Sequence, residues 1–287
     1  MNCSLFTRGA CLSVLLFSSV TVFARWEVTN FDKRFTFIAA RNGMLVGIEE
    51  TTRMPFKWEK PVWKKLGDQE FVYLATNGTT IAGIKQSDKN AYIFVSSSWQ
   101  KIGSQLGISF KQLVFDQQQL LGCCQDPAGF VFAWNNSSWR GVGIETFWNF
   151  DAAGAIICGV VQAYEDKNLN YQASQWHKKD WQNLGKKQFK QLVTNGTRIV
   201  GIEQPPKMHV FEWTGKQWQQ LGTEKLTQLA IDKNILCGIQ EKIQLILVWN
   251  GQRWLAYDTK KFIQAVTDGN TVYGLANDKR VYYWTSR

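Results

Sequence analysis

Short apolar runs separated by polar turns recur along the chain in repeated sets. The second run of each set carries a glycine that is followed by an apolar residue. Successive copies of this glycine are 36, 39, 37, 42, 37 and 36 residues apart. The copies are Gly47, Gly83, Gly122, Gly159, Gly201, Gly238 and Gly274. A period of roughly 20 to 50 residues is typical of repeat architectures. The chain therefore reads as seven copies of a unit of about 38 residues.

Each unit predicts four short strands and shows no helical period. The first strand starts at an aromatic or branched residue: Phe35, Phe71, Phe110, Phe147, Phe189, Leu226 or Phe262. It ends at a turn that is often Asn-Gly or Asp-Gly, a strong hairpin signal. The second strand carries the repeat glycine, and the third is rich in aromatic and branched residues. The fourth follows the pattern Trp-x-x-Leu/Ile/Val-Gly.

Tryptophan follows the same unit, because 13 of the 14 indoles fall on repeat positions. Pairs five residues apart join the third strand to the fourth: Trp58/Trp63, Trp134/Trp139, Trp176/Trp181, Trp213/Trp218 and Trp249/Trp254. A hairpin across the four intervening residues places the two indoles of a pair opposite each other. These indoles are predicted to pack between units, and Trp148 alone lies outside the scheme.

Evenly spaced four-stranded units predict an all-β fold, a seven-bladed β-propeller of four-stranded blades. The last unit stops at Trp284 without a fourth strand, whereas Trp26-Glu-Val-Thr-Asn near the start resembles a fourth strand with no first three. The N-terminal strand should therefore complete the last blade and remove an exposed sheet edge. Residues 25–287 are expected to form this single domain.

Residues 1–24 have the parts of a secretory signal peptide: Arg8, an apolar run from Ala10 to Val22, and small residues Val22 and Ala24 before the expected cleavage point. The protein is therefore expected to be secreted or periplasmic. Without the signal it has 32 basic and 23 acidic residues, a formal net charge of +9. This charge favours anionic partners, including glycans, lipopolysaccharide, acidic proteins and a peripheral contact with a membrane surface. Nucleic acid is not expected as a partner.

The unit Trp-x-x-Leu-Gly, then Phe-x-x-Leu-x-x-Asn-Gly-x-x-Ile-x-Gly-Ile, resembles the repeat of tectonin and tachylectin-type propellers along the whole predicted domain. That resemblance implies a lectin-like function, since many members bind lipopolysaccharide or modified sugars, whereas others are protein-interaction scaffolds. Six blades are common in the lectin members, against seven units here. Only framework positions match, so the resemblance assigns no sugar-binding residue.

The sequence favours binding over catalysis, and no cofactor or metal is expected. It has two histidines, His177 and His209, and no Ser/His/Asp arrangement or phosphate-binding glycine loop. We interpret Asp151, Asp232 and Asp268 as residues of the first turn in their units.

Four cysteines remain after the signal: Cys123, Cys124, Cys158 and Cys237. Cys158 and Cys237 precede the repeat glycine, where other units have Val, Ala or Leu, which indicates small buried residues. A Cys124–Cys158 disulfide is the alternative in an oxidising compartment.

The fourth unit departs most from the others and supplies the candidate site. Its segment from Gly159 to Trp176 spans 17 residues, against 10 to 12 elsewhere, and the insert carries Tyr164 and Tyr171. Trp148 occupies a position held by Lys111 and Lys190 in two other units. Propeller topology places this position, the insert and the basic connection with Lys186 and Lys187 on one face.

Two functions follow from this candidate site. In the first, Trp148, Tyr164 or Tyr171 stacks on a sugar of an anionic glycan or lipopolysaccharide, while Lys186, Lys187, Lys190 and Lys111 attract its charge. In the second, the protein is an interaction scaffold or a subunit of an envelope or secretion assembly.

Overall fold

The computed structural model describes residues 26–103, 107–117, 119–126, 129–165 and 168–285. Within these ranges every regular element is a β-strand, and no helix is long and apolar enough to cross a membrane. The predicted signal peptide, residues 1–24, lies outside the described residues.

Four sheets contain four strands each. The first contains β2 (Phe35–Arg41), β3 (Met44–Glu49), β4 (Pro55–Glu59) and β5 (Val62–Lys65). The second contains β6 (Phe71–Thr76), β7 (Ile81–Lys85), β8 (Ala91–Val95) and β9 (Ser98–Lys101). The third contains β10 (Ser109–Asp116), β11 (Gln119–Asp126), β12 (Val131–Trp134) and β13 (Trp139–Gly141). The fourth contains β24 (Phe262–Thr267), β25 (Thr271–Ala276), β26 (Val281–Thr285) and β1 (Glu27–Val28).

A fifth sheet has ten strands and covers the fourth, fifth and sixth sequence units. In chain order it contains β14 (Phe147–Ala153), β15 (Ile156–Glu165), β16 (Asn168–His177), β17 (Asp180–Thr194), β18 (Ile199–Glu203), β19 (His209–Trp213), β20 (Trp218–Asp232), β21 (Ile235–Gln240), β22 (Ile246–Trp249) and β23 (Trp254–Ala256). Strand β17 is 15 residues long: its Trp181 pairs with Trp176 of β16, and its Leu192 pairs with Gly201 of β18. Strand β20 likewise runs from one unit into the next without a break.

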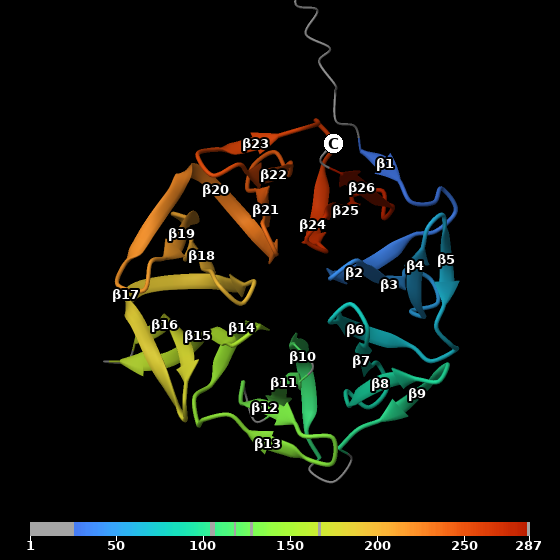
Figure 1. Ribbon diagram of the computed structural model, residues 1–287, viewed down its shortest axis with the longest axis horizontal. Helices are drawn as coiled ribbons and strands as arrows, with labels where there is room; N and C mark the ends of the chain where they lie inside the picture. Colours follow the sequence, from blue (N-terminus) through green and yellow to red (C-terminus); the bar gives the residue numbers. More distant parts are fainter. Residues whose placement is uncertain (1–25, 104–106, 118, 127–128, 166–167, 286–287) are drawn as a thin grey trace, which may run out of the picture.

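The sheets stand around a common centre (Figure 1). The first strand of each unit lies innermost, and it contacts the first strands of the two adjacent units, with β24 contacting β2. Strands from the two ends of the described chain share one sheet, since β1 pairs antiparallel with β26, Val28 opposite Tyr282. The N-terminal strand thus forms the outer edge of the sheet made by the last unit.

In six units the phenylalanine that opens the first strand packs over the repeat glycine, and in the sixth unit Leu226 takes its place. A Cβ added to Gly201 would lie 2.6 Å from Cδ1 of Phe189. The other side of the Phe189 ring meets Trp218, with ring centroids 4.3 Å apart. Trp218 is paired in turn with Trp213, directly opposite on β19, as the five-residue spacing predicts. A side chain on the glycine would push the phenylalanine out of this contact.

The pattern Trp-x-x-Leu-Gly joins neighbouring units. Trp254 Nε1 donates a hydrogen bond to the carbonyl oxygen of Leu221 in the preceding unit, at 2.8 Å. The next residue, Gly222, has a φ of 73°, and a Cβ added there would lie 2.8 Å from Cδ1 of Trp254. Leucine thus presents its carbonyl, while glycine adopts a left-handed conformation and leaves room for the indole.

The same contacts explain the N-terminal strand. Trp26 packs against Phe262 with ring centroids 4.7 Å apart, the contact that a fourth-strand tryptophan makes in other units. Thr29 stands in the leucine position, and its hydroxyl accepts a hydrogen bond from Trp63 Nε1 at 3.0 Å.

Amide side chains join the inner strands, whose edges have no further strand to pair with. Gln264 Nε2 donates to the carbonyl oxygen of Ile38 at 2.8 Å, and its Oε1 accepts from the Ile38 N–H at 2.9 Å. Gln191 makes the same pair of bonds with Leu229, at 3.1 and 2.9 Å. Single bonds of this kind come from Gln112, Asn149 and Gln228. Five junctions between units are therefore closed by an amide two residues after the opening position of the strand.

Changing Trp26 to Ala should lower the free energy of unfolding by about 3–5 kcal/mol, because Phe262 loses its stacked partner and the outer edge of the last sheet loosens. The matched control is Trp148→Ala, since that indole is 54% exposed and should cost less than about 1 kcal/mol. Urea unfolding followed by circular dichroism measures both. Equal midpoints for the two variants would contradict the assignment of β1.

Changing Gln264 to Leu should cost about 1–3 kcal/mol, because the Ile38 N–H and carbonyl both lose their partner in a partly buried place. Gln252→Leu, at an exposed turn position, makes the same chemical change and should shift stability by less than about 0.5 kcal/mol. Chemical denaturation of the two variants side by side checks this. A loss no larger than that of the control would show that the amide contributes nothing to the junction.

Candidate functional site

The inner strands surround a cavity of about 490 Å³. Side chains from β2, β6, β10, β14, β17, β20 and β24 all reach it, so the site is built by the whole set of units. This volume falls within the range of small-molecule and peptide sites. Among the described lining residues there is no histidine, serine or cysteine.

The wall of the cavity varies in chemical character at the level of the amide side chains. Phe37 and Tyr73 occupy the amide position in the first two units, and their rings lie 4.8 Å apart at 43°. Burial is the main cause of the raised pKa of Tyr73, with the charge of Asp151 acting in the same direction, so its hydroxyl stays protonated. One part of the wall is therefore aromatic, and the remainder is lined by amides.

Asp151 corrects the sequence interpretation, which placed this residue in a turn. It lies inside β14, opposite Cys158, and lines the cavity at a level where other units have alanine or valine. Its Oδ2 accepts a hydrogen bond from the Thr194 N–H at 2.9 Å, so it closes a junction as the amides do. Desolvation raises its pKa, although the charge of Arg41 and hydrogen bonds from Thr194 and Ala152 act in the opposite direction. The turn interpretation fits Asp268, whose Oδ1 accepts from the N–H of Thr271.

Arg41 lies at the end of the cavity that is nearest the turns between first and second strands. From β2 its Nη1 donates to the carbonyl oxygens of Ala152 on β14, at 2.7 Å, and Phe115 on β10, at 3.2 Å. It lines both the large cavity and a smaller one of about 180 Å³ beyond it. Nearby, burial raises the pKa of Asp116 to about 6, with the charge of Arg41 opposing this shift.

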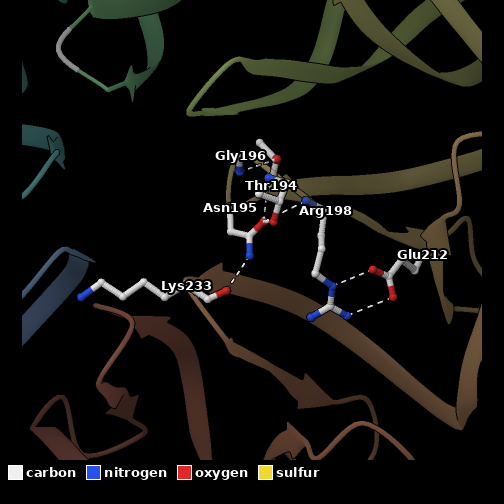
Figure 2. A network of polar contacts seen from close by, with 7 residues as sticks. Thr194, Asn195, Gly196, Arg198, Glu212 and Lys233 are labelled. Atoms are coloured by element: carbon white, nitrogen blue, oxygen red, sulfur yellow. Dashed lines mark hydrogen bonds and ion pairs between the residues drawn. The ribbon is translucent and has the colours of Figure 1, made fainter.

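The turns themselves are tied together around the smaller cavity (Figure 2). Asn195 Oδ1 accepts from the backbone of Arg198 at 2.9 Å, while its Nδ2 donates to the Lys233 carbonyl oxygen at 2.5 Å. Arg198 forms a two-bond ion pair with Glu212, at 2.6 and 3.0 Å. These asparagine turns hold this face in a fixed shape and use the polar groups that the sequence places there.

Trp148 lies at the opposite end of the inner strands, where it lines the cavity and is still 54% exposed. Tyr171 from β16 meets it edge-on, with ring centroids 5.9 Å apart at 77°. The structure therefore brings together two of the candidate aromatic residues. Tyr164 lies on β15, but its side chain is outside the described part of the chain.

The candidate lysines separate into two groups. Lys111 lines the cavity and donates to the carbonyl oxygen of Phe147 at 2.8 Å. Lys190 makes the equivalent bond to Thr227 at 3.0 Å. Both ammonium groups thus hold neighbouring inner strands together as well as carrying charge. Lys186 and Lys187 line a different cavity, between the middle of β17 and residues 203–207 at the end of β18.

The groups that could carry other chemistry are buried or dispersed. None of the four cysteines forms a disulfide, and all four are buried. Burial raises the pKa of Cys123 and of Cys237 to about 12, so these thiols are not nucleophiles near neutral pH. The described residues contain no group of three or more His, Cys, Asp or Glu placed to hold a metal ion.

The sequence pattern did not identify the amides that join the inner strands, and it did not single out Arg41. It did indicate Asp151, but as a residue of a turn. A signal for the amides was present, since Gln112, Asn149, Gln191, Gln228 and Gln264 each stand two residues after the opening position of a first strand. No repeated signal marks Arg41, which depends on a contact with units far away in the sequence.

No protein-family model and no curated protein matches the chain. Solved structures do. The propeller domain of the Trilobed protease from Pyrococcus furiosus, described as having an open velcro topology, covers 92% of this chain and 95% of its own, with 12% identity and a TM-score of 0.67. The CRINKLY WD40 ectodomain of the Arabidopsis thaliana receptor kinase ACR4 covers 88% and 100%, with 14% identity and a TM-score of 0.65.

A third similar structure is YCF48 bound to a D1 peptide, which covers 91% of this chain and 96% of its own, with 11% identity and a TM-score of 0.64. Identities this low speak for the fold alone. Taken with the strands described above, they show that this chain is an all-β protein with the β-propeller fold.

Proposed function

We propose that this protein is a non-catalytic binding propeller that takes its ligand at the open, Trp148 end of the central cavity. In this proposal the ring has seven four-stranded blades: β17 and β20 each serve two blades, and β1 completes the last one. The support is the pairing of β1 with β26 and the sequence of contacts from β2 through β6, β10, β14, β17 and β20 to β24.

The observation that carries the proposal is the exposure of Trp148. The other indoles pack between strands and units, whereas Trp148 lines the cavity near its mouth. Among the described residues its indole contacts the ring of Tyr171 and makes no hydrogen bond. An exposed tryptophan at a concave site is a costly surface feature, and tryptophan is enriched among residues that dominate binding energy. Tyr171 supports one edge of the ring and fixes its orientation.

We propose a segment of a protein partner as the ligand. The cavity of about 490 Å³ offers an aromatic wall, several amide groups and the cation Lys111 near its mouth, which suits side chains of mixed character. The similar structure of YCF48 holds a peptide, which supports this choice by fold likeness. A scaffold role in an envelope or secretion assembly would follow.

A second candidate ligand is an anionic glycan or lipopolysaccharide, and the Trp148–Tyr171 pair is the observation that favours it. An indole face of this kind stacks on a sugar ring, and the resemblance of the repeat to tectonin propellers points in the same direction. In both cases we propose export through the leader at residues 1–24 to a secreted or periplasmic location, where the net charge of +9 would also favour peripheral contact with an anionic membrane surface.

Changing Trp148 to Ala should weaken ligand binding by about ten- to a hundredfold, equivalent to about 1–3 kcal/mol, with little loss of stability. The wild-type protein and the variant are each used as bait against extracts of the producing cells, and recovered proteins are quantified by mass spectrometry. Direct titration of the recovered partner then gives the affinity. A glycan array probed with both forms decides between the two ligand classes.

Val62→Ala is the control, because Val62 is 56% exposed and lies on β5, away from the cavity. It should bind as the wild type does. If Trp148→Ala unfolds the protein, the indole belongs to the core; if the variant is stable and binds every recovered ligand unchanged, the site lies elsewhere on the disc.

A further inference from the structure

A cavity of about 390 Å³ lies outside the central site, between the middle of β17 and residues 203–207, which follow from the end of β18. Its charged lining residues are Lys186, Lys187 and Lys207 against a single carboxylate, Glu203, a formal excess of two positive charges. Lys225 adds a fourth ammonium group at its border, where Nζ donates to the carbonyl oxygen of Pro206 at 3.0 Å.

Glu203 organises this cavity rather than neutralising it. Its carboxylate is only 10% exposed, and one oxygen, Oε1, receives both Lys187 at 3.3 Å and Lys207 at 3.4 Å. His209 Nδ1 lies 3.8 Å from the other oxygen. Lys187 is held from a second side, with Nζ 3.8 Å from the centroid of the Phe211 ring. The carboxylate and the ring therefore hold the ammonium groups of Lys187 and Lys207 close together, and the single negative charge of Glu203 balances only part of the positive charge that lines the cavity.

The lysines differ in how strongly they are held. Lys207 is 69% exposed and can move toward a ligand at little cost. Lys186 is exposed and has no ion pair within 4.0 Å among the described residues. Lysine is a compact point charge with three donors, a common partner of phosphate. A phosphate monoester carries nearly two negative charges near pH 7.5, which matches the excess of two.

A second cavity adjoins the first and shares Lys186 and Gln188 with it. Its volume is about 540 Å³, and amide side chains make up most of its lining: Asn170, Gln172, Asn183 and Gln188. Hydrogen bonds between them fix their positions, Gln188 Nε2 donating to Asn170 Oδ1 at 3.0 Å and Asn183 donating to Gln172. Amides in fixed positions both donate and accept, as hydroxyl groups require. Among the residues that the structure describes, no aromatic or aliphatic side chain lines this second cavity.

From these two adjoining cavities we infer a binding site for a phosphate monoester carried on a polyhydroxylated molecule, a sugar phosphate in chemical class. The phosphate binds among Lys186, Lys187 and Lys207, and the hydroxyl groups extend over the amides on the other side of Lys186. This site is separate from the mouth of the central cavity and does not rest on the function proposed for Trp148.

The test is calorimetric titration of the full protein with glucose 6-phosphate, inorganic phosphate and glucose at pH 7.5 and low salt. Glucose 6-phosphate should bind most tightly, inorganic phosphate more weakly, and glucose not measurably. Added salt should weaken the binding of both phosphates, because the attraction is mainly between exposed charges. Trp148→Ala should bind all three as the wild type does, which separates this site from the proposed function.

Two variants test the charged residues of the cavity, one by removing positive charges and the other by removing the negative charge. Lys186→Gln combined with Lys207→Gln should lower the affinity for glucose 6-phosphate by about tenfold or more, since two ammonium groups are lost. Lys187 is left unchanged because it packs on Phe211. Glu203→Gln should instead raise the affinity, because the competing carboxylate is gone. The matched control is Lys179→Gln combined with Lys216→Gln, which makes the same change in net charge at exposed turns of the opposite face and should alter the affinity by less than about twofold.

The outcomes are distinct. Absence of phosphate binding, or equal losses in the double variant and its control, overturns the phosphate site. Equal affinity for inorganic phosphate and glucose 6-phosphate, or tighter binding of a phosphoserine peptide, overturns the polyhydroxylated ligand. Circular dichroism of each variant shows whether a loss of binding comes from a loss of fold.

Discussion

The contact of a phenylalanine with a glycine on one side and a tryptophan on the other is the interaction on which the rest of this molecule depends. In the fifth unit Phe189 lies over Gly201 and against Trp218, and its position sets the distance between the inner and the outer strands of its sheet. The indole then donates to the carbonyl oxygen of Leu184 in the preceding unit. One aromatic cluster therefore holds together both the inside of a unit and its junction with the preceding unit, and a misplaced glycine would disturb both.

The innermost strand of each unit has backbone N–H and carbonyl groups along its free edge, with no further strand to pair with them. The chain satisfies many of them with side chains. Gln191 and Gln264 each make two bonds to the next unit, and Asp151 adds a bond two residues further along β14 than that of Asn149. This arrangement shapes the cavity as much as it stabilises the ring. An amide side chain that is hydrogen-bonded to the backbone of the next unit is not free to rotate toward a ligand, so the walls of the cavity are stiff. Side chains that can adjust to a ligand therefore lie at the mouth of the cavity.

The sequence predicts the framework well because the framework repeats. Phenylalanine, glycine and paired tryptophans recur at fixed distances, and the all-β propeller and the Trp213–Trp218 type of pair follow from them. The site is different, because its residues are departures from the repeat. Trp148 and Tyr171 could be found as exceptions, and the structure does bring their rings together. Asp151 was misread as a turn residue because aspartate is typical of this turn, but it stands four residues after Phe147, whereas Asp268 stands six residues after Phe262.

Side-chain contacts between strands are the part that the sequence could not supply. That Lys187 stacks on Phe211 and shares Glu203 with Lys207 depends on how β17, β18 and β19 lie together, and spacing along the chain gives no measure of it. The same holds for Lys190, which a count of charges treats as a free cation but which binds the carbonyl oxygen of Thr227.

Arg41 gives the molecule a direction. By reaching from β2 to the backbone of β10 and β14, its side chain lies across the end of the cavity that is opposite Trp148. A ligand that enters beside Trp148, as we propose, therefore meets the aromatic pair first and the guanidinium group last. The two ends of the cavity differ in chemistry, so the cavity distinguishes the two orientations of a bound segment.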